Sequence, residues 1–278
     1  MTDYSFGWIR DYPDFRDFSV KSTAVKDYVI EGYTKEEVPS AYDITKQIVM
    51  PTVFDQGKLN SCTAHAGVMM YMIYLKVAGL GGEPLSRLFL YKTTRDLLNM
   101  DGDFGAFLRT TMQALAMFGV PPEKYYPYDE KKVNEDPQAR IYAMAQNYQA
   151  LTYYRLDPIH KDAQSILDSV KANIWCNRPC MFGFVVYDTI DDKTGNVELP
   201  TKTSNRRGGH AVTAVAFDDD YEFPKSKIKG GIKFVNSWRE EWGQNGFGWL
   251  PYEYIRLGLA VDWWTMMTAE WLDTKQFE

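Results

Sequence analysis

The sequence predicts an α+β protein of two lobes, with helices in the first half of the chain and strands in the second. Between residues 62 and 118 the apolar residues recur at helical spacing, and Gly79 and Gly119 follow two of the predicted helices. From residue 180 onward, apolar runs between turn-forming residues are typical of strands. Helices followed by strands indicate an α+β chain rather than repeated βαβ units.

Four helices are expected in chain order. They cover residues 63–77, 85–98 (with Ser86 as the cap), 108–118 and 163–175. Apolar side chains surround most of the first helix, so it should be central and buried.

Three strands are expected in the second half. They are C-M-F-G-F-V-V-Y from Cys180, H-A-V-T-A-V-A-F from His210 and G-I-K-F-V from Gly231, separated by turns near residues 193–196, 218–220 and 230–231. The length of 278 residues favours roughly two domains. We expect a helical domain over 38–150 and a β-rich domain over 151–278, preceded by an extension over 1–37.

Composition favours a soluble globular protein and excludes several classes of function. The net charge of −6 has the wrong sign for a nucleic-acid binder. The longest apolar run, residues 66–75, is far shorter than the roughly 20 residues needed to span a bilayer. No signal peptide is recognisable, so a cytoplasmic or other intracellular location is expected. We also expect a monomer. The spare cysteines and histidines lack ligand spacing, so neither a metal nor an organic cofactor is expected.

A cysteine stands where the first helix begins. Cys62 follows a turn that contains Gly57, Asn60 and Ser61. The N–H groups and dipole of a helix start favour an anion there, and so the reactive thiolate. The alternative is a small buried apolar residue, as cysteines often are.

Three further residues favour nucleophilic catalysis. Gln56 lies six positions before Cys62, so the turn between them could fold its amide back beside the sulfur, where it could donate to a developing oxyanion. His210 opens an apolar strand after a glycine pair, and Asn236 ends another strand. A thiol, an imidazole and an orienting amide are the groups that acyl transfer needs.

The chain resembles a papain-family cysteine peptidase over about residues 38–264. That family has its nucleophile at a helix start and its histidine about 130–150 residues downstream, as Cys62 and His210 are here. The segment N-S-W-R-E-E-W-G-Q-N-G-F-G-W, which begins at Asn236, resembles the family's N-S-W-G-x-x-W-G-x-x-G-Y.

The resemblance implies a papain-like two-lobed fold, with a β-barrel-like second lobe and the active site in a cleft between the lobes. It assigns the nucleophile to Cys62, the base to His210, the orienting amide to Asn236 and the oxyanion donor to Gln56. Of the substrate-binding candidates, Trp238 and Trp242 match the family's indoles beside the imidazole, and the other four are Gly105, Ala106, Phe107 and Asp262. Asp262 either favours a basic substrate side chain or is a buried structural acid.

Two departures from the family pattern are visible. Thr63 stands where the family has tryptophan or tyrosine, and S-C-T-A-H-A resembles a divergent bacterial and viral branch. Animal and plant members carry disulfides around the active site, but besides Cys62 this chain has only Cys176 and Cys180, which either pair with each other or are free packed thiols.

Two questions about the function stay open at this point. The chain is expected to be an endopeptidase, but a catalytically silent peptide-binding module and a thioester acyl transferase or peptide ligase are alternatives. Residues 1–37 alternate aromatic and charged residues around Pro13, a pattern that needs a surface to lie on. They are either a short segment packed on the mature fold or, as in family zymogens, an inhibitory segment that occupies the cleft, followed by a linker over 21–37.

His65, one helical turn after Cys62, is the rival for the general base.

Overall fold

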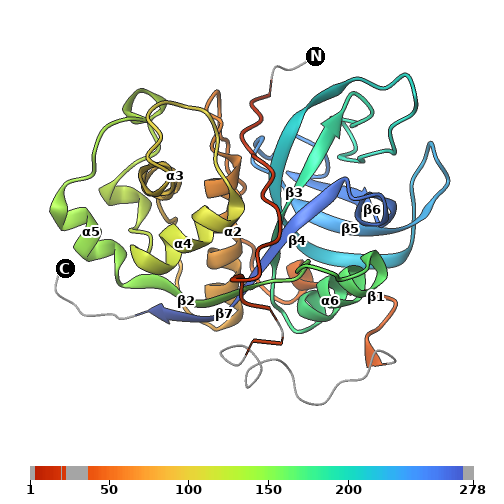
Figure 1. The fold of residues 1–278 in the computed structure, drawn as a ribbon, viewed down its shortest axis with the longest axis horizontal. Helices are drawn as coiled ribbons and strands as arrows, with labels where there is room; N and C mark the ends of the chain where they lie inside the picture. The colour runs from red at the N-terminus through yellow and green to blue at the C-terminus, as the bar shows by residue number, and fades with distance from the viewer. Residues whose placement is uncertain (1–3, 20, 23–36, 272–278) are drawn as a thin grey trace.

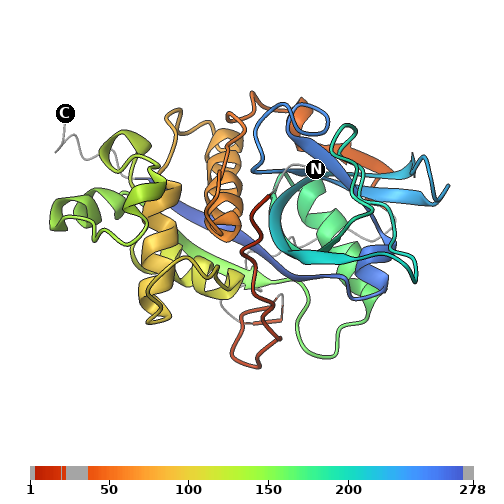
Figure 2. The same cartoon turned by 90° about the horizontal axis from the view of Figure 1, so that it is seen from above.

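The fold separates helices from strands, as the sequence predicts. The computed structural model of the chain describes residues 4–19, 21–22 and 37–271. Most of the predicted linker, residues 23–36, therefore lies outside the described residues. Figure 1 shows helices α2 to α5 on one side, most of the sheet on the other, and the N-terminal residues running between them. Figure 2 shows the same arrangement from above.

The helical lobe is built around one buried helix. Helix α2 is buried along almost its whole length and packs against both neighbouring helices and the sheet. Ser86 caps α3 by accepting a hydrogen bond from the Phe89 N–H, which confirms the predicted cap. The helices of this lobe are α2 Cys62–Val77, α3 Arg87–Leu97, α4 Leu108–Met117 and α5 Ala139–Ala145, with short 3-10 helices at Glu123–Tyr125 (η3) and Glu130–Lys132 (η4). Helix α5 was not predicted from the sequence.

The described residues form one antiparallel sheet with seven strands in the order β2-β7-β3-β4-β5-β6, and β1 pairs with β4 beside it. The strands are β1 Ala41–Asp43, β2 Tyr148–Arg155, β3 Cys180–Tyr187, β4 Arg206–Glu222, β5 Lys229–Val235, β6 Phe247–Pro251 and β7 Ala260–Trp271. The remaining helices are η2 Ile44–Lys46, α6 Ala163–Trp175 and α7 Glu253–Arg256. The predicted strands and the helix over 163–175 are confirmed.

Two parts of the chain cross between the lobes. Strand β1, which the predicted boundaries place in the helical domain, pairs with β4 through Ala41 and Asp218. Strands β2 and β7 pair with each other and pack against α4 of the helical lobe. The predicted domain boundaries stay a prediction. Strands β1, β2 and β7 each contact elements on the other side of those boundaries.

Candidate active site

The predicted nucleophile is the first residue of α2 and is fully buried. Ser61 stands at the N-cap but makes no side-chain cap hydrogen bond to the helix. The first N–H groups of α2 are therefore not taken by a side-chain cap, and those of Cys62 and Thr63 interact with the thiol. The backbone N–H groups of Ala211, in β4, and of Gly7 also interact with the thiol.

The predicted base and its orienting amide are in contact. His210 lies in β4, and Asn236 directly follows β5, which pairs with β4. The His210 Nε2 atom is 2.7 Å from Oδ1 of Asn236, and that same oxygen accepts the Ser237 N–H at 2.8 Å. An amide oxygen is an acceptor, so Nε2 carries the proton and Nδ1 has the free lone pair. Nδ1 is buried and has no hydrogen-bond partner among the described residues.

One of the two indoles named from the resemblance lies against the imidazole, and the other lies behind it. Trp238 stacks on His210 with ring centroids 4.4 Å apart, and Trp242 meets Trp238 edge-on. Tyr4 stacks on the other side of Trp238 at 4.1 Å. The imidazole is thus shielded from water by aromatic rings and by the N-terminal residues.

The Gln56 side chain is held in one orientation. Its Oε1 accepts the Ser237 hydroxyl at 2.7 Å, and its Nε2 donates to the Leu59 carbonyl at 2.9 Å. The same Nε2 also donates to the carbonyl oxygen of Ser5 at 3.2 Å. Gln56 therefore presents an N–H donor to a backbone carbonyl that approaches from outside the lobes.

Residues 4–17, here called the strap, cover this site. Their backbone pairs with both lobes: Ala106 N–H donates to Gly7 O at 2.8 Å, Ile9 N–H to Ala106 O at 3.0 Å, and Trp8 N–H to Gly209 O at 3.1 Å. Trp8 and Ala106 form a parallel bridge. These contacts occupy the backbone groups of Ala106, one of the residues predicted to bind substrate.

Gly105 and Phe107, also predicted to bind substrate, stand on either side of Ala106. Gly105 adopts a positive φ of 85°, and a Cβ there would lie 2.2 Å from the Gly7 carbonyl oxygen, so only glycine fits. Phe107 is half-buried at the N-cap of α4, and its carbonyl accepts from Thr111 within that helix. A role for Phe107 in binding substrate stays a prediction.

Asp262 is fully buried and hydrogen-bonded to the strap. Its Oδ2 accepts the Trp8 indole N–H at 3.1 Å, and its Oδ1 accepts the Trp264 indole N–H at 2.8 Å and lies 3.3 Å from an Arg155 nitrogen. Burial raises the pKa of this carboxyl to about 7, although Arg155 acts in the opposite direction.

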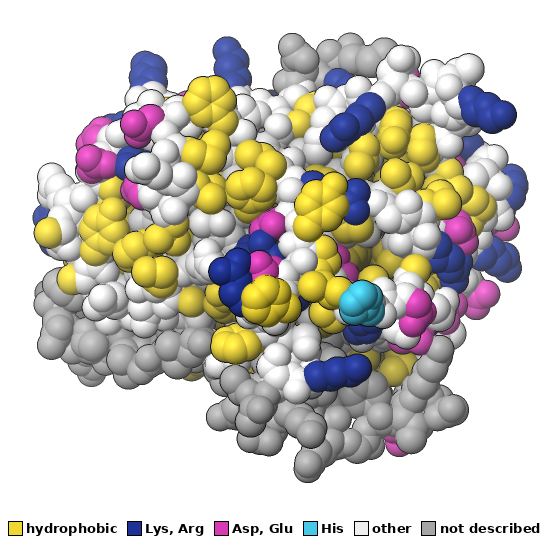
Figure 3. Space-filling view, viewed as in Figure 1, with side chains coloured by type: hydrophobic (Ala, Val, Ile, Leu, Met, Phe, Trp, Pro, Cys, Tyr) yellow, Lys and Arg dark blue, Asp and Glu magenta, His cyan; other side chains and the backbone are white. Residues whose placement is uncertain are grey.

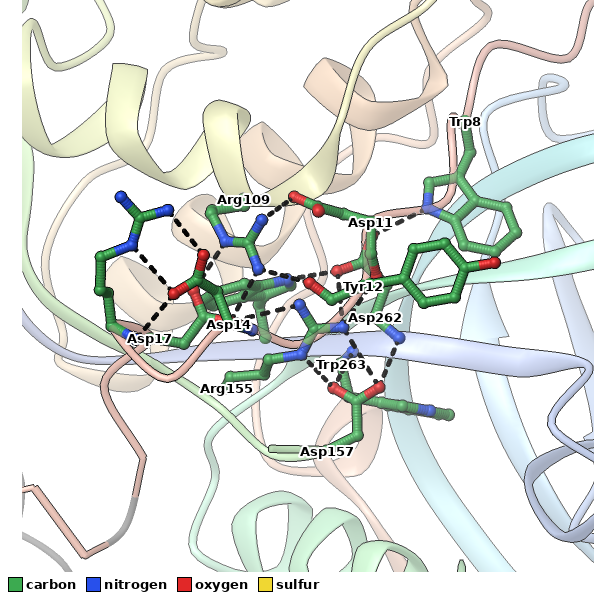
Figure 4. A network of polar contacts seen from close by, with 12 residues as sticks. Trp8, Asp11, Tyr12, Asp14, Asp17, Arg109, Arg155, Asp157, Asp262 and Trp263 are labelled. Carbon is green, nitrogen blue, oxygen red and sulfur yellow. Dashed lines mark hydrogen bonds and ion pairs between the residues drawn. The ribbon is translucent and has the colours of Figure 1, made fainter. Parts of the chain in front are cut away.

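A charged cluster anchors the strap to both lobes (Figure 4). Arg109 of α4 binds Asp11 and, at 2.6 Å, Asp17. Arg155 of β2 lies 3.5 Å from Asp17 and 2.9 Å from Asp157. Figure 3 shows acidic and basic side chains together at the centre of this face, where the strap crosses. Sequence reasoning missed these partners of the strap, and only its alternating aromatic and acidic residues indicated that it binds a surface.

The electrostatics of the covered site differ from the expectation. A helix start was expected to lower the pKa of Cys62, but burial raises it to about 11, and the N–H groups of Ala211 and Gly7 offset this only in part. Burial also lowers the pKa of His210 to about 4, against the effect of Asn236. Desolvation disfavours both charged forms, so beneath the strap the pair is a neutral thiol and a neutral imidazole.

The remaining cysteines and histidines lie outside this arrangement. The His65 ring is buried and contacts Ser61 through Nδ1, at 3.0 Å from its carbonyl. Burial, with the nearby Arg87, lowers the pKa of His65 to about 3, a setting that fits a structural role. Cys176 and Cys180 are free thiols, which confirms the unpaired alternative.

The structure also bears on membranes and metals. No helix in the described part of the chain is long and apolar enough to cross a bilayer. Within residues 4–19, 21–22 and 37–271, no group of three or more His, Cys, Asp or Glu side chains is placed to hold a metal ion.

Comparison with known proteins gives the same picture of fold and family. The model of the papain family of cysteine proteases matches residues 38–259. An uncharacterised peptidase C1-like protein of Acanthamoeba polyphaga mimivirus is 32% identical over 275 residues, which covers 94% of this chain and 86% of that protein. The viral relative fits the divergent branch that the motif S-C-T-A-H-A indicates.

Solved structures with the same fold include bacterial and protozoan proteins. Xylellain, a cysteine protease from Xylella fastidiosa, is 30% identical with a TM-score of 0.76, over 95% of this chain and 96% of that one. A procathepsin B from Trypanosoma congolense has a TM-score of 0.65 at 19% identity, over 87% and 82% of the two chains, a likeness of fold alone.

The two-lobed α+β fold, with a cysteine at a helix start and a histidine and asparagine on adjoining strands, defines a cysteine-type peptidase. The chain belongs to the papain family of cysteine proteases.

Proposed function

We propose that the chain is an endopeptidase in which Cys62 is the nucleophile, His210 the general base and acid, and Asn236 the residue that orients the imidazole. The observation that carries this is the free Nδ1 of His210, buried beside the strand residue whose N–H contacts the Cys62 thiol. With Nε2 fixed on Asn236, Nδ1 is the atom that takes the thiol proton.

The reaction then proceeds in two steps. The Cys62 sulfur attacks the peptide carbonyl carbon, the carbon–nitrogen bond breaks, and the amine leaves with the proton from His210. The acyl group remains as a thioester, which water hydrolyses with His210 as the base. The stacked Trp238 keeps water away from the imidazole during the first step.

The oxyanion of each tetrahedral intermediate is assigned to the Gln56 side chain and the Cys62 backbone N–H. Gln56 Nε2 already donates to a backbone carbonyl, that of Ser5, which supports its role as a carbonyl donor. Because Oε1 is bound by Ser237, the amide is oriented before substrate arrives, as electrostatic stabilisation requires.

Gln56→Ala should lower kcat/KM by roughly 10²- to 10³-fold, the usual cost of one oxyanion donor. The measurement is peptide hydrolysis in the Arg109→Met background, in which the strap should detach more often. Ser237→Ala is the matched comparison: it removes one orienting contact, but Nε2 stays a donor held at the Leu59 carbonyl, so its loss should be smaller. Equal losses in the two variants would contradict the assignment.

The strap is proposed to be inhibitory. It occupies the Ala106 and Gly209 backbone groups and places a backbone N–H, that of Gly7, against the thiol. An N–H facing the sulfur leaves it without an electrophilic carbon to attack, so the strap binds without being cut. Of the two earlier interpretations of residues 1–37, these contacts favour the segment that blocks the site.

The covered thiol should react with iodoacetamide slowly near neutral pH, at a rate that rises toward pH 11. Burial holds its pKa at about 11 rather than the ordinary 9.0, so the thiolate fraction at pH 7 is about 10²-fold lower. Once the strap is displaced, water, the helix start and His210 favour the thiolate, and the apparent pKa should fall below 9. Labelling of the Cys62 peptide by mass spectrometry across pH gives both values. An intact chain with an apparent pKa below 8 would contradict this.

A further inference from the structure

The side chain of Trp8 fills a pocket formed by three neighbouring strands of the sheet. Its exposed fraction is 7%. It lies against Gly183 of β3 and Gly209 of β4, and its indole N–H reaches Asp262 of β7. These strands belong to the same sheet as His210, so the pocket is part of the scaffold of the active site.

Two glycines make the space for the indole. A Cβ on Gly183 would lie 1.9 Å from Trp8 Cε2, and a Cβ on Gly209 would lie 2.8 Å from Trp8 Cε3. Contacts this short are not tolerated against a rigid ring. Gly183 has no positive φ, so here the absence of a side chain, and not an unusual φ, is what glycine supplies.

The far end of the pocket offers one acceptor atom. Oδ2 of Asp262 accepts the Trp8 N–H at 3.1 Å. The other carboxylate oxygen is taken up by Trp264 at 2.8 Å and by Arg155 at 3.3 Å. Arg155 is itself fully buried and is shared between Asp262 and Asp157, which lies closer to it at 2.9 Å. A second cation in the pocket would be repelled by Arg155, whereas a neutral N–H donor completes the set of hydrogen bonds.

We propose that this pocket selects tryptophan, a flat neutral side chain with an N–H donor, at one position of the substrate, and that Asp262 is the residue that determines this choice. The substrate class is therefore peptides with a tryptophan near the scissile bond, and Trp8 inhibits by occupying that site. This rests on the proposed function for its catalytic meaning. It differs from both alternatives that the sequence left open for Asp262, a preference for a basic side chain and a buried structural acid.

The backbone contacts of Trp8 support this position for a substrate side chain. Its N–H binds Gly209, the residue before His210, and its neighbours Gly7 and Ile9 pair with Ala106. A peptide that adds as a strand at Ala106 would present a side chain to the same pocket. Trp8 directly follows Gly7, whose backbone N–H interacts with the Cys62 thiol. The pocket therefore lies beside the proposed nucleophile.

The test uses the full chain with Trp8→Ala and free indole as the probe, measured by calorimetry and by the shift in Tm. Indole should bind saturably. The affinity for 1-methylindole, which lacks the N–H, should be lower by about tenfold or more. Propylguanidine should not compete. Adding Gly183→Ala should abolish indole binding, while adding the exposed Gly82→Ala, which meets no neighbouring atom, should not change it.

Three results would overturn the proposal, each in a variant shown to be folded by circular dichroism. They are equal affinity for indole and 1-methylindole, stronger binding of propylguanidine, and no binding of indole. If Trp8→Ala does not fold, Trp8→Phe in full-length chain serves instead: its peptidase activity should favour tryptophan-containing over phenylalanine- or arginine-containing peptides. Because indole binding needs no turnover, failure there leaves the catalytic assignment untouched, and an inactive enzyme that binds indole would contradict only the proposed function.

Discussion

Arg109→Met should raise the peptidase activity of the full chain by about 10- to 100-fold. Arg109 binds Asp11 and Asp17, and the Asp17 carboxylate is only 4% exposed. Hydrogen bonds to charged groups at such sites contribute roughly 1.5–3 kcal/mol, and each 1.4 kcal/mol is about a tenfold change in the population of the open state. Of its side-chain contacts to the lobes, Asp17 then keeps the longer one to Arg155, so the strap should detach more often. The measurement is the initial rate on a fluorogenic peptide.

Arg16→Met is the matched control for this variant. Arg16 is 77% exposed and pairs with Asp14, within the strap itself, so it does not hold the strap to either lobe. Its rate should equal that of the unmodified chain. Equal rates for the Arg109 and Arg16 variants, with both folded and the same Tm, would show that the charged cluster does not restrain the strap.

Cys62→Ala should abolish peptide hydrolysis, with a loss of at least about 10⁴-fold in the Arg109→Met background. Removing the nucleophile of a catalytic unit costs this much or more, because the base and orienting residue then have nothing to activate. Cys176→Ala should leave the rate unchanged, since Cys176 lies at the end of α6 and is a free thiol. Residual turnover by a verified Cys62→Ala preparation would reject Cys62 as the nucleophile.

The catalytic constellation could be predicted because each member carries a local signal. Cys62 follows a turn and opens a helix, and His210 and Asn236 stand at the start and end of apolar runs that become paired strands. The structure places the two imidazole–amide atoms 2.7 Å apart. Ser86 and the four predicted helices could be found for the same reason, since capping and periodicity are properties of neighbouring residues.

The restraint on the site could not be predicted, because it depends on partners far apart in the sequence. Trp8 meets Asp262, and Asp17 meets both Arg109 and Arg155. No periodicity links these residues, and each taken alone is an ordinary aromatic or charged side chain. The sequence showed only that the N-terminal residues need a surface.

The pKa of Cys62 was wrongly expected to be low for this same reason. The helix start favours the thiolate, but the strap removes water from the sulfur, and burial then dominates. A local sequence pattern predicts the effect of the helix start on the pKa of Cys62. It does not predict that the strap covers the thiol. The two effects belong to two states of the chain, with and without the strap in place.

The central claim is that Cys62 is an activatable nucleophile held beneath the strap, and intact mass after exposure to an epoxide electrophile of the papain-inhibitor type tests it most directly. The chains to compare are the full chain, Arg109→Met, Arg16→Met and Arg109→Met with Cys62→Ala. We predict a single adduct that forms fast in Arg109→Met, slowly in the full chain and in Arg16→Met, and not at all without Cys62. No adduct in folded Arg109→Met, even on long exposure, would contradict the account and favour a catalytically silent binding module.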